Sequence, residues 1–586
     1  MSVKRESLRD RLSRYFENPK DQNLGEQSES GNAKQMTVNP TLILHNGRIW
    51  TGDDNQPWAQ SLVISGNHIR AIGGDREIQK SFSTDCPRID LGGRLCIPGL
   101  WDAHIHFYYW SLGLEQVQLA GCSSLREMLG RIRENLPSHT GNAWSTGWGW
   151  NETLWEESAL PTRHDLDRET GLERPALFYR SDMHSAVANT AALNLAGLLE
   201  PGLTVEGGVI DRDKSGQPTG VLRELAINLV RDHVPAPTGE HTDRALLAGL
   251  QQLHRLGVTG ICEQRMKDQE DGPKALAAFA RLNRAKKLKL RVSCNIAAHN
   301  LPLVEALGVS SNMGDEYLRL GHIKIFADGT LGSRTAFMLQ PFLSGEFDDH
   351  DNRGMMLTPP EQIASELKRA VEIGFPVSIH AIGDRANRLC LDLFEELRAT
   401  GAEPPMIPHR IEHVQILASE DISRLAELGI TASLQPAHIL DDMDTADAYL
   451  GERASAAYRL RALHESGALL AFGSDAPVAE INPFYGIHGA VYRQRPERMA
   501  EPAWQPQELL DLETTLKAYT IGAARAAGWD RLSGSLQPGK KADLCVLDRD
   551  LFEIVQGEVS GHEIAATQVL MTVFDGEIVH SVEGVF

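Results

Sequence analysis

The sequence has few cysteines, and their spacing excludes a disulfide framework. Seven cysteines are spread over 586 residues, none of them in a Cys-x-x-Cys pair, and the odd number leaves one over. Small secreted proteins that depend on disulfides have dense, even-numbered cysteines, and disulfides are rare where thiols are kept reduced. The cysteine content therefore favours a reducing compartment.

Long apolar stretches are also missing. Residues 1–20 carry charges throughout and contain no apolar core of about 7–15 residues, so they do not resemble a secretory signal. No window approaches about 18 uncharged apolar residues, the length that a transmembrane helix requires. We therefore expect a cytoplasmic protein with no membrane partner.

Positive charge is in deficit. The chain has 58 Lys and Arg residues against 79 Asp and Glu residues, which gives a formal net charge of −21. Sequence-independent binding to nucleic acid requires clustered Lys and Arg facing phosphates, so this balance argues against such a partner. The contents of hydrophobic residues, 42%, and charged residues, 23%, are ordinary for a globular protein, and we expect it to act on a small molecule.

Short β-type runs occur at both ends of the chain. Turn signals of Gly, Asn and Asp separate them, as in TLILHNGRIWTG and SLVISGNHIRAIGG near the start and KADLCVLDRD near the end. This pattern predicts one small β-sandwich built from residues 37–96 and 531–586. The polar residues 1–36 predict a flexible N-terminal extension.

Between these ends, eight apolar runs lead towards helical patterns and predict a barrel domain at residues 97–530. The runs are LCIPGLWDAHIHF, GVTGICEQ, KLRVSCNIAAH, GHIKIFADG, FPVSIHAIGD, HRIEHVQ, ITASLQP and LLAFGSDAPV. Continuous apolar runs fit parallel strands buried on both faces, so eight of them predict an α/β fold with a (β/α)₈ TIM-type barrel. The long stretch after the first run predicts an insertion at about 140–235 that covers one barrel end.

Polar residues that can bind a metal ion lie at or near the carboxyl ends of these runs. They are, in chain order, His104, His106, Lys324, His380, His413 and Asp475. In a (β/α)₈ barrel the carboxyl ends of the strands surround one mouth, so we expect the six side chains to share one pocket. His104 and His106 lie two residues apart, so both side chains point the same way on a strand.

These residue types are typical of a divalent metal site. Neutral imidazole and carboxylate oxygen suit Zn²⁺ or a similar ion, and a bound ion lowers the pKa of its water to about 7. An aspartate that touches both metal and water, here Asp475, can take and return protons. Each residue alone has a structural alternative, such as a turn for Asp475 or a snorkelling side chain for Lys324. Their joint order on successive strands favours the metal site.

From about residue 40 onward the chain resembles the amidohydrolase superfamily, and specifically its YtcJ-like branch, which includes N-substituted formamide deformylases. The motifs that carry this resemblance are HNGRIWT, IPGLWDAHIHF, KIFADGTLGSRTA, HAIGDRAN, RIEHVQ, GSDAPV and GSLQPGKKADLCVLD. The resemblance implies that the histidines and the aspartate named above hold one or two divalent ions, expected to be Zn²⁺. In a dinuclear site it implies that Lys324 is carbamylated and bridges both ions. It also implies a homodimer.

The chemistry and the resemblance together predict a hydrolase of a non-peptide C–N bond. We expect a carboxamide or N-substituted formamide with an apolar or aryl substituent, attacked by metal-bound hydroxide with Asp475 as general base and acid. A deaminase or a cyclic amidase of a heterocycle is the alternative within this class. A non-catalytic metal-binding regulatory protein is a further alternative, although all expected positions are filled, which favours an enzyme.

Aromatic residues indicate where the substituent binds. An aromatic-lined pocket is predicted by two tryptophans of GWGWNETLW and by a tyrosine that follows His104 and His106. Packing of the insertion on the barrel rim is the alternative. His184 is a candidate because it lies in a motif of the YtcJ-like branch. Arg334 is a candidate partner for a substrate carboxylate, with a salt bridge in the barrel as the alternative. The candidate substrate contacts are Tyr109, Trp148, Trp150, Asn151, His184 and Arg334.

Overall fold

The structure is a computed structural model, and the predicted extension at residues 1–36 lies outside the residues that it describes. It describes residues 42–82, 86–136, 144–156, 159–200, 202–205, 207–265, 271–343, 351–402, 405–557 and 562–586. In this part of the chain, no helix combines the length and the apolar character that crossing a bilayer demands.

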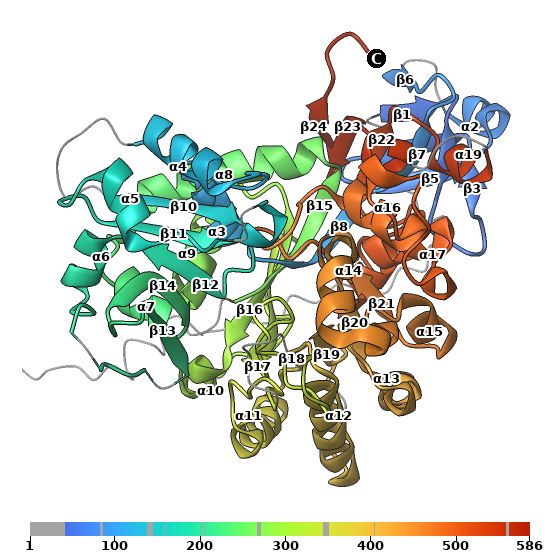
Figure 1. Cartoon of the computed structure of the whole chain (residues 1–586). Coiled ribbons are helices and arrows are strands. Elements are labelled where there is room, and N and C mark those ends of the chain that lie inside the picture. Colours follow the sequence, from blue (N-terminus) through green and yellow to red (C-terminus); the bar gives the residue numbers. More distant parts are fainter. Residues whose placement is uncertain are drawn as a thin grey trace, which may run out of the picture. The chain divides into compact units, whose positions relative to one another are not determined.

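Eight parallel strands form the central sheet, one from each of the predicted apolar runs (Figure 1). They are β8 (Leu100–Ile105), β15 (Val258–Glu263), β16 (Arg291–Ala297), β17 (Leu318–Phe326), β18 (Val377–Ala381), β19 (Arg410–His413), β20 (Thr431–Leu434) and β21 (Leu470–Phe472). Each strand pairs in parallel with the next along the chain. The backbone N–H of Asp475, just after β21, donates to the carbonyl of His104 in β8 at 2.6 Å, which brings the last strand back to the first. The predicted barrel is confirmed.

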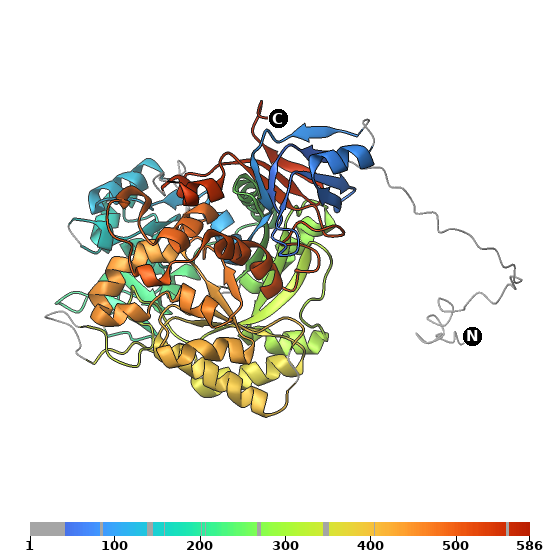
Figure 2. The same ribbon diagram turned by 90° about the vertical axis from the view of Figure 1, so that its right-hand side faces the viewer.

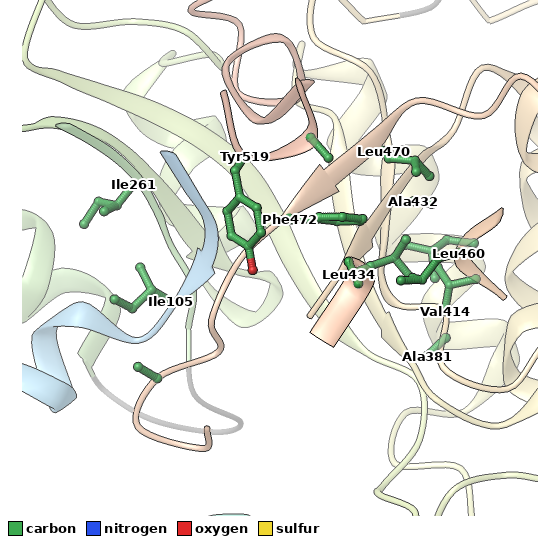
Figure 3. Packing of buried hydrophobic residues seen from close by; sticks show 14 of the residues in the cluster. Ile105, Ile261, Ala381, Val414, Ala432, Leu434, Leu460, Leu470, Phe472 and Tyr519 are labelled. Carbon is green, nitrogen blue, oxygen red and sulfur yellow. The ribbon is translucent and has the colours of Figure 1, made fainter. Parts of the chain in front are cut away.

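Amphipathic helices follow the strands and complete the apolar core. In α11 the residues Ile363, Leu367 and Ala370, spaced for one helical face, are buried. The ring of Phe472 in β21 and the ring of Tyr519, which follows α17, meet edge to face with centroids 5.5 Å apart (Figure 3). These helices are α3 (Phe107–Gly113), α8 (Gly239–Arg255), α9 (Asp271–Arg284), α10 (Leu301–Leu307), α11 (Pro360–Glu372), α12 (Asp384–Ala399), α13 (Ile422–Leu428), α14 (Ala437–Leu450), α15 (Leu460–Glu465), α16 (Pro483–Tyr492), α17 (Leu512–Lys517) and α18 (Ala523–Ala526).

Strands from both chain ends form the predicted β-sandwich (Figure 2). One sheet has the order β5-β4-β1-β6, and the other has the order β24-β23-β22-β7-β2-β3, in which β22 pairs antiparallel with β7. Apolar residues of both sheets share one core, as Leu62 and Val546 do. The elements are β1 (Leu42–His45), β2 (Arg48–Trp50), β3 (Trp58–Ala59), β4 (Ser61–Ser65), β5 (His68–Gly73), α2 (Asp75–Ser81), β6 (Arg88–Asp90), β7 (Leu95–Pro98), β22 (Leu544–Leu547), α19 (Leu551–Gln556), α20 (His562–Ala565), β23 (Val569–Phe574) and β24 (Glu577–Ser581).

The insertion after the first barrel strand has a mixed sheet of its own, drawn from blue through cyan to green in Figure 1, with the order β13-β14-β12-β11-β10-β9. The sheet already includes β9, so it begins earlier than the boundary near residue 140 that was predicted. Its elements are β9 (Val117–Gln118), α4 (Leu125–Glu134), β10 (Ser145–Trp150), α5 (Arg163–Thr170), β11 (Ala176–Arg180), β12 (Ser185–Ala188), α6 (Thr190–Leu195), β13 (Gly208–Arg212), β14 (Pro218–Glu224) and α7 (Ala226–Arg231).

The insertion docks on the loop that follows β17. The hydroxyl of Ser333 donates to Asp182 at 2.9 Å, and the hydroxyl of Thr335 donates to Glu224 at 3.2 Å. Asp182 and Glu224 belong to the insertion, whereas Ser333 and Thr335 follow the barrel strand that carries Lys324. The insertion therefore lies at the carboxyl end of the barrel and covers one barrel end, as predicted.

Candidate functional site

All six predicted metal-site residues line one cavity at the carboxyl end of the barrel, with a volume of about 1770 Å³. They come from β8 and the residue after it, from β17, β18 and β19, and from the loop after β21. The cavity exceeds the roughly 300–1,000 Å³ of most small-molecule sites, so it has room for an extended substrate.

The tightest group in this cavity consists of His104, His413 and Asp475. One possible ligand atom from each lies within 4.8 Å of the others, and all three are buried. The Oδ1 atom of Asp475 lies 3.2 Å from Nε2 of His104 and 3.1 Å from Nε2 of His106. His413 and Asp475 adopt left-handed φ angles of 72° and 61°, a region that non-glycine residues rarely occupy and that is enriched at functional sites.

Burial sets the protonation of the imidazoles. It lowers the pKa of His106 to about 4, and it is the largest cause that holds the pKa of His380 and of His413 well below the usual range. These rings are therefore neutral near pH 7, the form in which imidazole binds a metal ion.

The carboxylates make the centre of the site favourable for a cation. Burial alone would raise the pKa of Asp475, but the charge of His104 and the hydrogen bonds of His104 and His106 outweigh it and hold that pKa well below the usual range. Burial would also lower the pKa of His104, yet Asp475 and Glu412 raise it. Positive charge is thus stabilised at this point, as a divalent ion requires.

Lys324 is buried in the wall of the same cavity, with 2% of its surface exposed. Its Nζ has no hydrogen-bond partner among the described residues and lies 4.9 Å from the ring centroid of Phe326. Burial lowers the pKa of the amine to about 8, so a substantial fraction is neutral and nucleophilic near pH 8.

The side chains present fit a metal ion. Buried polar atoms normally have a partner, yet among the described residues Nδ1 of His106, Nδ1 of His413 and Nζ of Lys324 have none. Neutral imidazoles, an ionised carboxylate and a neutralisable amine in one buried cluster suit a divalent metal ion.

Glu412, which was not predicted, contacts the Nδ1 side of the His104 ring. Its carboxylate is fully buried and lies 2.6 Å from Nδ1 of His104, and it accepts from Nε of Arg410 at 2.8 Å and from the hydroxyl of Ser378 at 2.6 Å. Burial opposes ionisation, but Arg410 and His104 hold the pKa of Glu412 well below the usual range. An ionised Glu412 accepts from Nδ1–H of His104 and so leaves Nε2 available to bind a metal ion. The spacing of Arg410 and Glu412 in RIEH was the available signal.

Replacing Glu412 with Gln is expected to weaken metal binding about 10- to 100-fold, because the partner that orients His104 loses its charge. The measurement is a competition titration of the metal against a chromogenic chelator. Glu420→Gln serves as the matched control, because the Glu420 side chain is 78% exposed and should leave the affinity unchanged. Equal affinity of the E412Q variant and the parent would refute this role for Glu412.

Four of the six predicted substrate contacts line the cavity. They are Tyr109, Trp148, Asn151 and His184. Nδ1 of His184 lies 2.9 Å from the carboxylate of Glu224, a buried residue of β14 that was not predicted. The insertion therefore supplies both aromatic and polar wall to the site.

Trp150 was predicted to line the cavity, but it does not. It is fully buried in the core of the insertion, its indole N–H donates to the carbonyl of Phe178 at 3.0 Å, and its ring lies 6.3 Å from that of Trp155. Strand periodicity would place Trp150 on the same side as Trp148. Gly149 has a φ of 104° and the pairing register shifts at this point, so a bulge turns Trp150 away from the cavity.

Arg334 was also predicted as a substrate contact, but it is not among the residues that line the cavity. Its guanidinium lies over the ring of Tyr449, 5.2 Å from the centroid. Conversely, His438 was not predicted, although it lines the cavity with Nε2 3.6 Å from Oδ2 of Asp475. The apolar sequence around it, PAHIL, contains no signal that distinguishes it from an ordinary helix start.

Comparisons with known proteins show the family of this chain. A family model described as "Amidohydrolase family" matches residues 88–580. The putative amidohydrolase YtcJ of Bacillus subtilis is 30% identical over 542 residues, which cover 92% of this chain and 99% of that protein. The N-substituted formamide deformylase of Arthrobacter pascens is 27% identical over 562 residues, covering 92% and 98%. An uncharacterized metal-dependent hydrolase from Pyrococcus horikoshii has 28% identity and a TM-score of 0.70, with 87% and 97% covered.

The family match includes the whole barrel, the insertion and about half of the sandwich, so it is not confined to one part of the fold. It also includes every residue of the buried histidine and aspartate cluster. From its sequence, its barrel and its relatives, the chain belongs to the amidohydrolase family and is a metal-dependent hydrolase that acts on carbon–nitrogen bonds.

Proposed function

We propose that this protein hydrolyses a carboxamide, most suitably an N-substituted formamide, whose substituent is apolar or aryl. The observation that carries the proposal is the composition of the cavity, in which Tyr109 and Trp148 line the same space as the buried group of His104, His413 and Asp475. Aromatic walls bind apolar groups, whereas the polar cluster suits a carbonyl. The relative from Arthrobacter pascens, named as an N-substituted formamide deformylase, supports the same class.

The proposed metal site uses the six residues predicted from the sequence. A bound divalent ion, which we take to be Zn²⁺, would lower the pKa of a water molecule and polarise the carbonyl of the amide. If two ions bind, a carbamylated Lys324 would supply negatively charged oxygens between them in place of a buried amine. The proposed ligands are His104, His106, Lys324, His380, His413 and Asp475.

In this proposal Asp475 moves the proton. Its pKa lies well below the usual range, so it is ionised and can accept a proton from the attacking water. It then gives that proton to the leaving nitrogen as the C–N bond breaks, which releases an amine and a carboxylic acid, formic acid in the case of a formamide. Asn151 and His184 contact the substrate from the insertion, and Trp148 packs against its substituent.

A hydrolysis screen on protein loaded with Zn²⁺ tests this function. The substrates are formyl and acetyl derivatives of aniline, cyclohexylamine and 2-phenylethylamine, together with aminated and cyclic-amide heterocycles. We expect release of the free amine from the formyl derivatives, fastest with the aryl substituents, measured by fluorescamine labelling. Hydrolysis of the heterocycles alone would replace the proposal with its alternative, a deaminase or cyclic amidase.

A further inference from the structure

His438 occupies a position in the cavity that no predicted site residue shares. It is the second residue of α14 and follows β20, the seventh barrel strand, which carries none of the proposed metal ligands. Its side chain is 12% exposed, and its Nε2 is a buried atom with no hydrogen-bond partner among the described residues. A buried polar atom without a partner is costly, so this nitrogen is suited to a group that arrives with the substrate.

The two oxygens of Asp475 face different neighbours. Oδ1 faces Nε2 of His104 and Nε2 of His106, at 3.2 and 3.1 Å, whereas Oδ2 lies 3.6 Å from Nε2 of His438. The last distance is longer than a hydrogen bond, for which about 2.7–3.2 Å is usual. A third atom about 2.9 Å from both Oδ2 and Nε2 would complete a triangle with hydrogen-bonding sides.

The surroundings of His438 hold it in place. Its backbone N–H donates to the carbonyl of Gln435 at 3.0 Å, and its ring stacks beside that of His413 with centroids 6.1 Å apart. One turn along α14, Asp442 accepts from the hydroxyl of Tyr458 at 2.6 Å and from the side-chain amide of Gln415 at 2.9 Å. The turn that presents His438 is therefore anchored before substrate binds, as a positioned catalytic group requires.

We infer that His438 contacts the substrate by accepting a hydrogen bond from the N–H of the scissile amide, and so holds the leaving nitrogen against Oδ2 of Asp475. The inference rests on the proposed function. As the C–N bond breaks, its electron pair stays on nitrogen and takes the proton from Asp475, while the original N–H of the substrate donates to Nε2 of His438. His438 exchanges no proton. The site is consequently specific for N-monosubstituted amides, because N,N-disubstituted amides have no N–H to donate.

The test compares two substrates that differ by one methyl group, N-(2-phenylethyl)formamide and N-methyl-N-(2-phenylethyl)formamide. We expect the parent protein to hydrolyse the first with a kcat/KM about 100-fold higher, the size of effect seen when one transition-state hydrogen bond is lost. The His438→Leu variant should lose about 100-fold on the first substrate and change by no more than about threefold on the second. His438→Gln, whose side-chain carbonyl can also accept, should recover part of the loss.

Metal content by mass spectrometry accompanies the kinetics and should equal that of the parent in both variants. His164→Leu is the matched control, because His164 is 69% exposed on the insertion helix α5, and it should change neither substrate. Equal slowing of both substrates in H438L, or loss of metal, would overturn the inference, as would a parent that hydrolyses both amides equally well. A parent that hydrolyses neither amide, nor any amide of the screen, contradicts the proposed function itself.

Discussion

The Asp475→Asn variant is expected to lose at least about 1,000-fold in kcat/KM, because general acid–base catalysis contributes about 10²- to 10⁴-fold and this residue would serve both steps. Asn has nearly the same shape as Asp, but it can neither accept a proton from the nucleophile nor return one to the leaving nitrogen. The buried position of Asp475 and its contacts with His104 and His106 leave no other ionised carboxylate among the tightest group of possible ligands. The measurement is steady-state hydrolysis of the best amide of the screen.

Asp54→Asn provides the control for the Asp475 variant. Asp54 lies on the surface with its side chain 80% exposed and pairs with Lys517, so its replacement should leave kcat/KM unchanged. Circular dichroism and the metal content of D475N show whether the variant is folded and loaded. A folded and loaded D475N variant with parental kcat would exclude Asp475 as the proton carrier.

Removal of the metal ion is expected to abolish hydrolysis and to lower the melting temperature. Three imidazoles whose pKa values are low and the ionised Asp475 form a preorganised site, and its ion would be lost to a strong chelator such as dipicolinate. A ligand present at about 100 times its Kd stabilises the folded state by about 2.7 kcal/mol, so the apoprotein should melt earlier. Hydrolysis and calorimetry before and after treatment, and again after adding Zn²⁺, measure both effects.

Dipicolinate already saturated with Zn²⁺ is the control for this experiment and should leave the activity intact. Recovery of activity at two ions per chain, with dependence on bicarbonate, would support a carbamylated Lys324 between the ions. Recovery at one ion would support the mononuclear site. Full activity in protein from which mass spectrometry detects no metal would contradict metal dependence.

The barrel was predictable because each of its strands has a local signature. Apolar runs such as the one that contains Ile379 and the one that contains Ile411 are continuous, since both faces of a parallel barrel strand are buried. The ends of such strands meet at one mouth, so the order of His380, His413 and Asp475 along the chain was sufficient to place them around one cavity. The β-sandwich followed from short strands at both ends of the chain.

The wall of the cavity was less predictable. Trp148 and Trp150 are the same residue type and lie two residues apart, so the local sequence does not distinguish them. Of the two, only Trp148 lines the cavity. The bulge at Gly149 separates them, and a bulge depends on how a strand pairs with its neighbour. Arg334 likewise turned to the ring of Tyr449, a contact between residues 115 positions apart that no local pattern contains.

By itself, the sequence determined which groups are available to bind a metal ion and in which order the barrel strands present them. Only the tertiary structure decided which groups support them. The contact of Glu412 with His104 joins residues 308 positions apart, and the approach of His438 to Asp475 joins a helix and a loop tens of residues apart. Periodicity is a property of neighbouring residues, whereas hydrogen bonds and buried charge pairs depend on three-dimensional distance. The sequence therefore predicted the candidate metal ligands, and the fold selected the residues that lie beside them.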